Sequence, residues 1–365
     1  MLKFLRLKTL DRYIIQKYLS TFFFSILIFT LISVAIDFSD KVQSFIEKPC
    51  TLKNIVVDYY FGFIGYITSL LMPMYTLIAV VFFTSRLAFN AEILAILNAG
   101  VSFNRILKPY LIAGSIVFML HLALNHFIIP HLNKSRLWFE HTFVWVDQDR
   151  GKTSNVHLLL SKDVKVYIRG YNKVNKTANG LRLEKFVGNR VLSILEAENA
   201  NFKAEPNQWQ LTSYTIRTFD GIKENLIRST KPLDTLINLN PQDFVYYQNQ
   251  NQEMTTPELR NAIFREAERG QANKSYEIEL HRRTADAFTN IILTIIGLAV
   301  AGRKVRGGMG LHLAIAIGIG AIFILLSKFA VSFANSGSMS VMLGMWVPNI
   351  IFGIVAIWLV SRAQK

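Results

Sequence analysis

The stretch Tyr18–Ile36, YLSTFFFSILIFTLISVAI, decides the fold, because it holds no charged residue from end to end. An apolar run of about 20 residues crosses the hydrocarbon core of a membrane as one helix. Further runs of this kind follow at 59–85, 109–133, 287–302, 307–327 and 341–361, and the short run at 287–302 is extended by residues 284–286. The sequence therefore predicts an α-helical membrane protein with six transmembrane helices.

The spans fall into two groups of three around a long polar insert. This arrangement predicts transmembrane helices in 1–133, an inserted domain in 134–283 and transmembrane helices in 284–365. Basic residues gather on one side of such a chain; they are Lys3, Arg6, Lys8, Arg12, Lys17, Arg86, Arg105, Lys108, Arg303, Lys304, Arg306, Arg362 and Lys365. The positive-inside rule places both termini in the cytoplasm and the insert on the periplasmic side. The net charge of +15 is thus partly a topology signal, and we do not expect nucleic-acid binding.

The insert has the pattern of an all-β domain. Val164–Arg169 alternates apolar and polar residues, and Trp209–Phe219 is rich in Thr, Tyr and Ile. Turn signals such as Asn179-Gly180 and Asp220-Gly221 recur at short intervals. About six or seven short strands with this spacing favour a sandwich or jelly-roll domain. We expect the insert to end in a short helix that begins near Thr256.

A second stretch, Glu92–Ser102 with the sequence EILAILNAGVS, lies between the second and third spans. A plain polar turn would be enough to join two spans, yet this stretch carries an acidic residue, an apolar stripe and a glycine. These features predict a small helix at about 90–101 that docks on a partner protein. The expected docking residues are Arg86, Glu92, Leu94, Ala95, Leu97 and Gly100. The alternative is an interfacial helix that lies on lipid.

Catalytic functions find no support in the sequence. It contains no His-Glu-x-x-His motif, no Gly-x-Ser-x-Gly motif, no cluster of Cys and His suited to a metal ion, and no nucleotide site. We therefore expect neither an enzyme nor a bound cofactor. A membrane sensor or scaffold, whose outer domain senses and whose inner helix reports, is an alternative class of function.

Several motifs in a fixed order resemble the LptF/LptG family of lipopolysaccharide-export permeases. They are Leu10-Asp-Arg-Tyr-Ile14, Pro73 within the second span, Arg86-Leu87, Asn90–Ser102, Asn240-Pro-Gln-Asp243, Met254–Leu259, Tyr276–Arg283 and Trp346-Val-Pro-Asn349. The resemblance covers essentially the whole chain. It implies an ATP-driven exporter in the bacterial inner membrane, in which a separate cytoplasmic ABC ATPase dimer binds the coupling helices. It also implies a homologous six-span permease subunit and a single-span periplasmic bridge protein that receives the lipid through jelly-roll domains.

The same resemblance implies a cavity for lipopolysaccharide, which needs an apolar wall and cations at its outer rim. The expected lipid-binding residues are Phe24, Ile28 and Leu31 on the first span, Ile324 on the fifth, and Lys41 and Lys328 at their outer ends. Asp37 stands where some family members carry a basic residue, so the phosphate contact is expected at Lys41 or on the partner subunit. Two alternatives remain open: the lysines anchor helices at the interface, or the cargo is another lipid or a protein.

Overall fold

The computed structural model describes residues 8–144, 153–172, 175–188, 190–204, 207–221, 223–239, 249–268, 274–303 and 308–363. Several residues used above for orientation or resemblance lie outside these ranges, namely Lys3, Arg6, Lys304, Arg306, Lys365 and the stretch Asn240-Pro-Gln-Asp243. The chain forms two compact units. The first contains Met1–Val144, Asn251–Leu259 and Lys274–Lys365, and the second contains Trp145–Gln250 and Arg260–Asn273.

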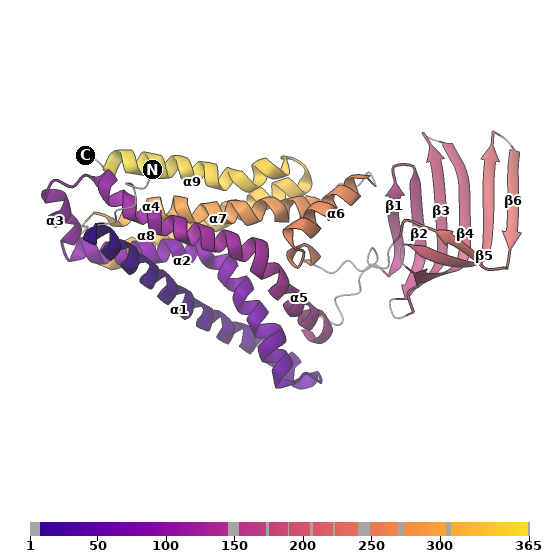
Figure 1. The fold of residues 1–365 in the computed structure, drawn as a ribbon, viewed down its shortest axis with the longest axis horizontal. Helices are drawn as coiled ribbons and strands as arrows, with labels where there is room; N and C mark the ends of the chain where they lie inside the picture. The colour runs from indigo at the N-terminus through magenta and orange to yellow at the C-terminus, as the bar shows by residue number, and fades with distance from the viewer. Residues whose placement is uncertain are drawn as a thin grey trace. The chain divides into compact units, whose positions relative to one another are not determined.

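Within the described residues, six helices are long and apolar enough to cross a membrane (Figure 1). The first span is α1 (Thr9–Glu47), and the second is η2 (Asn54–Tyr60) followed by α2 (Phe61–Phe89). The third span consists of four consecutive segments: α4 (Phe103–Ala123), η3 (Leu124–Ile128), α5 (Ile129–Phe139) and η4 (Glu140–Val144). The last three spans are α7 (Lys274–Ala301), α8 (Gly308–Ser336) and α9 (Val341–Ala363). The short helix α3 (Glu92–Asn98) joins the second and third spans, and α6 (Thr256–Glu268) precedes α7.

The third and fourth spans extend further toward the insert than their uncharged runs. The third continues through two π-helical segments to Val144, and the fourth begins at Lys274. Charged residues in the extension of the third span pair with each other: Arg136 Nη1 lies 3.3 Å from Glu140 Oε2, and both side chains are buried. Because each charge has a partner, the helix continues past the residue at which the hydropathy pattern ends.

The inserted domain is an antiparallel sheet, which confirms the expected fold class of six spans with an inserted β domain. Its strands in the described residues are β1 (Ser154–Ser161), β2 (Val164–Asn172), β3 (Thr177–Val187), β4 (Arg190–Ala204), β5 (Gln208–Asp220), β6 (Lys223–Ser229) and β7 (Leu233–Leu236). β1 to β6 pair in sequence order. In β2, Val166 and Ile168 are buried while Lys165 and Arg169 are exposed, as the alternating pattern predicts.

One edge of β5 serves two partners. β7 pairs with the first part of β5, Gln208–Leu211, and β6 pairs with the second part, Tyr214–Asp220. Between them, Ser213 has a φ of 51°, a left-handed conformation that is uncommon for a residue with a side chain. The change of partner therefore coincides with a local break in the strand. Trp209 in the first part is fully buried, and its Nε1 donates a hydrogen bond of 2.8 Å to the Leu239 carbonyl.

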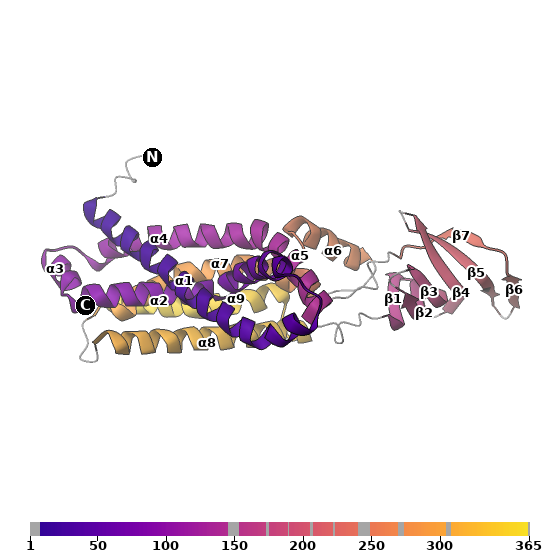
Figure 2. The same cartoon turned by 90° about the horizontal axis from the view of Figure 1, so that it is seen from below.

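α7 lies inside the bundle against α2, α4 and α9 (Figure 2). Two small residues allow the close approach. A Cβ atom on Gly297 would lie 2.8 Å from Val80 Cγ1, and one on Gly114 would lie 2.9 Å from Thr294 Oγ1. Small residues are common where membrane helices pack, because the hydrophobic effect does not drive helices together in lipid and close van der Waals contact must do so.

Hydrogen bonds between buried polar side chains also link α7 to its neighbours. Thr76 on α2 donates to Asn290 at 2.8 Å, and Tyr18 on α1 shares a bond of the same length with Thr294. Asn349 on α9 accepts from Thr289 at 2.8 Å. In a bilayer, polar side chains need such internal partners because lipid supplies none. Buried hydrogen bonds therefore link α7 to α1, α2 and α9.

Candidate coupling and lipid-binding sites

The short helix α3 is separated from its neighbours by two left-handed residues. Ala91, which precedes it, has a φ of 58°, and Gly100, which follows it, has a φ of 81°. The Gly100 N–H donates to the Leu97 carbonyl at 3.0 Å, and the Val101 N–H donates to the Ile96 carbonyl at 3.4 Å. This pair of bonds is a Schellman motif. Glycine is favoured at the left-handed position of the motif because it has no Cβ atom that would clash there. α3 is thus a discrete one-helix unit.

α3 has one buried apolar residue and an exposed apolar face. Ile93 is 4% exposed and packs into the core of the bundle with Ile106 and Leu87. Elsewhere on the helix, Leu94 is 53% exposed, Leu97 is 37% exposed and Ala95 is also exposed. The structure therefore places the three apolar docking residues of the sequence analysis together on the surface.

The charged residues expected at the docking helix lie beside it. Glu92 begins α3, and its Oε2 accepts a hydrogen bond of 3.2 Å from the Tyr13 hydroxyl on α1. Arg86 is exposed in the last turn of α2. The contact between Tyr13 and Glu92 joins residues that are 79 positions apart, and the sequence gives no signal for it.

An ion pair next to α3 was not expected from the sequence. The two terminal nitrogens of the Arg105 guanidinium lie 2.6 and 2.8 Å from the two carboxylate oxygens of Asp11. Asp11 is 1% exposed, and it also accepts a hydrogen bond of 3.0 Å from the Lys8 N–H. In the sequence, Arg105 is one of the basic residues that indicate the cytoplasmic side, and Asp11 is part of the motif Leu10–Ile14. Neither pattern predicts that the two side chains contact each other.

At the opposite end of α1, Lys41 lies in a cluster of charged side chains. Its Nζ is 2.8 Å from Asp37 Oδ1 and 3.1 Å from Glu140 Oε1, and the Lys41 side chain is 15% exposed. Tyr59 on η2 contacts both Lys41 and Asp37. Arg136 pairs with Glu140 from the other side. Lys41 is therefore a partnered cation that ties α1 to η4, and Asp37 is one of its partners.

The other expected lipid-binding residues are exposed on two helices. Phe24 is 59% exposed, Ile28 39% and Leu31 63%, all on α1. On α8, Ile324 is 39% exposed and Lys328 is exposed as well. Both α1 and α8 pack against α2. These residues thus form apolar faces on two spans that share a neighbour.

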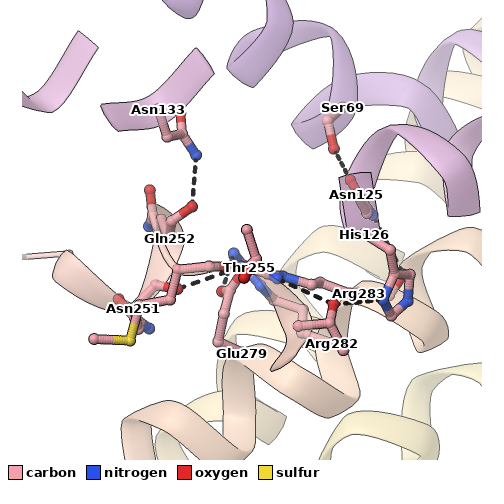
Figure 3. A network of polar contacts seen from close by, with 12 residues as sticks. Ser69, Asn125, His126, Asn133, Asn251, Gln252, Thr255, Glu279, Arg282 and Arg283 are labelled. Atoms are coloured by element: carbon pink, nitrogen blue, oxygen red, sulfur yellow. Dashed lines mark hydrogen bonds and ion pairs between the residues drawn. The ribbon is translucent and has the colours of Figure 1, made fainter. Parts of the chain in front are cut away.

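A network of polar contacts anchors the segment that leads from the insert back to the spans (Figure 3). Arg283 on α7 is 3% exposed, and its Nη2 donates to the backbone carbonyls of Asn251 at 3.3 Å and Met254 at 2.8 Å. Its Nε donates to Glu279 at 3.0 Å. From α5, Asn133 donates to the Gln252 carbonyl at 3.1 Å. Arg283 ends the motif Tyr276–Arg283, and Met254 begins the motif Met254–Leu259. The sequence predicts no role for either motif, and the structure shows that they contact each other.

A cavity of about 30 Å³ lies beside this network, between α2, η3, α5 and α7. Its wall includes Ser69, Glu279, Arg282 and Asp286 (Figure 3 shows the first three). A space of this volume holds one or two water molecules when polar groups surround it. Water in this cavity can therefore solvate the charged side chains of its wall. The cavity is too small for a lipid.

Comparison with known proteins agrees with this architecture. The model of the family described as lipopolysaccharide export system permease LptF/LptG matches residues 12–362, nearly the whole chain. No curated protein matches the chain. Six spans and an inserted antiparallel domain fit an integral protein of the inner membrane, and permeases of this family are transporter subunits, not enzymes. The chain belongs to the LptF/LptG family of lipopolysaccharide export system permeases.

Proposed function

We propose that this chain is the permease subunit of an ATP-driven lipopolysaccharide export complex. It extracts the lipid from the inner membrane and passes it to a periplasmic bridge. The observation that carries the proposal is the family match over residues 12–362. The exposed apolar face of α3 supports it, because the sequence has no nucleotide site and the energy must come from a partner.

In this proposal both termini and α3 lie in the cytoplasm, where α3 docks on an ABC ATPase dimer. Leu94, Ala95 and Leu97 enter an apolar groove of the ATPase, and Glu92 pairs with a basic residue there. Arg86 flanks the contact, and Gly100 fixes the end of the helix. Apolar side chains with a charged group beside them suit an interface that has an apolar core and a polar rim.

The proposed assembly contains two permease chains. The described part of the chain offers one docking helix, α3, whereas an ATPase dimer has two equivalent grooves, and a closed complex fills both. We therefore propose a homologous six-span chain as the partner. A single-span periplasmic bridge protein receives the lipid from the inserted β domain.

The proposed lipid site uses the exposed face of α1 together with α8. Phe24, Ile28 and Leu31 contact acyl chains from one side and Ile324 from the other. Lys41 and Lys328 lie further along the same helices, at the height of the lipid phosphates. A phosphate that binds Lys41 takes the place of a carboxylate partner, and Arg136 then remains on Glu140. Such charge-assisted contacts are stronger than neutral ones.

The proposed function is tested by reconstitution. The chain is purified with the ABC ATPase and the homologous six-span chain of the same cell and placed in vesicles that contain lipopolysaccharide. We expect a native mass that corresponds to both permease chains and an ATPase dimer, and an ATP-dependent transfer of lipopolysaccharide to the soluble part of the bridge protein. A sensor or scaffold would bind the ATPase without this transfer, and that result would refute the proposal.

Photo-crosslinking tests the lipid site in the same complex. We expect a photoreactive residue at Leu31, Lys41 or Lys328 to label lipopolysaccharide, and we expect Lys328→Glu to reduce export by about tenfold, since a carboxylate at the rim repels the phosphate. Lys41→Glu is a second variant, but it sets a third carboxylate beside Asp37 and Glu140, so its thermal stability is measured along with its export.

Ile357 provides a matched control for the labelling. It is 73% exposed on α9, on a span outside the proposed wall, so a photoreactive residue there should label each lipid only in proportion to its share of the bilayer. If Lys41 and Lys328 label no more lipopolysaccharide than Ile357, and both glutamate variants export normally, the two lysines only anchor their helices.

A further inference from the structure

α1 is fastened near its first turns, close to the helix α3. Asp11 is bound by Arg105, and the Tyr13 hydroxyl donates to Glu92. Two further residues of this part, Ile14 and Tyr18, are fully buried, and the Tyr18 hydroxyl lies 2.8 Å from Thr294 Oγ1 on α7. The first turns of α1 are thus held by α3, α4 and α7 together.

The contact between Asp11 and Arg105 is the most specific of these attachments. Both carboxylate oxygens meet separate guanidinium nitrogens, at 2.6 and 2.8 Å. This two-point geometry fixes orientation as well as distance, which a single ion pair does not. The Asp11 side chain is 2% exposed, whereas Arg105 is 31% exposed and reaches it from the surface. The pair therefore fixes the start of α1 relative to the start of α4.

Arg105 follows α3 through a short, ordered connection. α3 ends at Asn98, the Schellman motif closes with Val101, and α4 begins at Phe103. The Arg105 N–H donates to the Ser102 carbonyl at 3.0 Å, so Arg105 lies in the first turn of α4. Backbone hydrogen bonds thus order both ends of this connection, and only four residues separate α3 from α4.

The middle of α1 has one packed face and one exposed face. Phe22 and Thr30 are buried and Phe29 stacks on Tyr75 of α2, whereas Phe23, Leu27 and Leu31 are 54%, 58% and 63% exposed. The next charged contact along the helix is at Asp37 and Lys41. A movement of the fixed start of such a helix is passed along its length, including its exposed face. The Tyr13–Glu92 hydrogen bond adds a second attachment, directly to α3.

We infer that Asp11 and Arg105 form a positioning pair through which displacement of α3 reaches α1 and its lipid-facing side. This inference rests on the proposed function, in which an ATPase moves α3 and lipid contacts α1. Neither residue touches the ATPase or the lipid in the proposal; each acts by fixing α1 to α4 beside the docking helix.

The pair is tested in the full complex by three replacements. Asp11→Asn keeps the shape and an acceptor for the Lys8 N–H but removes the charge. Arg105→Lys keeps the charge but cannot contact both oxygens with a planar fork. The double variant Asp11→Arg with Arg105→Asp reverses the pair. Arg12→Gln is the matched control, because Arg12 is the exposed neighbour of Asp11 on the same helix.

Movement of α1 is measured directly by the distance between spin labels on Ile36 of α1 and Ile354 of α9. Both side chains are exposed, at 58% and 64%, and Cys50, the only cysteine, is first replaced by serine. In the unaltered complex we expect this distance to change when the ATPase binds ATP. In Asp11→Asn and Arg105→Lys we expect the change to be lost, and lipid exported per ATP hydrolysed to fall by about fivefold or more.

A purely structural role for the pair predicts a different result. In that case the variants would lose ATPase association and thermal stability, and hydrolysis would fall with export. We expect association and hydrolysis to be retained, Arg12→Gln to behave as the unaltered chain, and the reversed pair to restore part of the distance change. If Asp11→Asn and Arg105→Lys keep the full ATP-dependent distance change, or if they lose it only by losing the ATPase, the inference is wrong.

The outcome is distinct from a failure of the proposed function. The distance between the labels reports whether α1 follows α3 and does not depend on which lipid is carried. An unaltered complex that shows the distance change but moves no lipopolysaccharide would refute the proposed cargo and leave the positioning pair intact. An unaltered complex without any ATP-dependent distance change would refute the positioning pair, whatever the cargo.

Discussion

Arg283→Ala is expected to destabilise the helical unit more than any other single replacement considered for this chain. Arg283 is 3% exposed, and its guanidinium donates hydrogen bonds to the Glu279 carboxylate and to the backbone carbonyls of Asn251 and Met254. Truncation leaves the Glu279 carboxylate, which is 5% exposed, with Arg282 as its remaining cation. Removal of one partner from a buried ion pair costs about 3–5 kcal/mol.

Thermal unfolding of the purified chain in detergent measures this effect. Arg283→Lys keeps the charge but has fewer donors, so we expect its melting temperature to lie between those of the alanine variant and the unaltered chain. Arg260→Ala is the matched control, since Arg260 is exposed on α6, the helix that precedes α7 in the chain. A melting temperature of Arg283→Ala within about two degrees of that control would show that the network in Figure 3 adds little stability.

Glu92→Lys is expected to separate the permease from its ATPase. In the proposed interface Glu92 pairs with a basic residue, so a lysine places two cations together beside Leu94 and Leu97. Truncation of one member of a buried, hydrogen-bonded charge pair at an interface costs about 2–5 kcal/mol, and reversal adds repulsion. We expect the ATPase to be lost in co-purification, or to hydrolyse ATP without lipid export.

Two controls separate the interface from local structure. Tyr13→Phe removes only the intramolecular hydrogen bond to Glu92, and Asn98→Lys adds a lysine to the exposed end of α3 without removing the glutamate. Both are expected to retain the ATPase better than Glu92→Lys does. Normal co-purification and normal export in Glu92→Lys would remove Glu92 from the coupling mechanism.

The spans and the β domain could be predicted because their patterns are local. An uncharged run such as Tyr18–Ile36 has few alternatives to a transmembrane helix, and alternation such as that in Val164–Arg169 marks a strand with one buried side. The extension of the third span to Val144 could not be predicted in this way. Arg136 and Glu140 interrupt the apolar pattern, and only their pairing in space makes them compatible with a continuing helix.

The candidate sites divide along the same line. α3 and its exposed apolar face follow from the spacing of Leu94, Leu97 and Gly100, which is a local pattern. Glu140, one partner of Lys41, and Asp11, the partner of Arg105, lie on other helices, and one sequence without an alignment carries no record of such pairings. Lys41 therefore has the pattern of an exposed rim cation, whereas the structure gives it two carboxylates.

The attachment of α1 at both ends, with an exposed middle, has a consequence for how such a permease evolves. Phe23, Phe24 and Leu27 make few contacts within the chain, so apolar replacements at these positions change its stability little. The ends, with Asp11 bound to Arg105 and Lys41 bound to Glu140, tolerate few replacements. In the proposed lipid site, the side chains that contact acyl chains can therefore vary along the exposed face of this helix without loss of the contacts at its two ends.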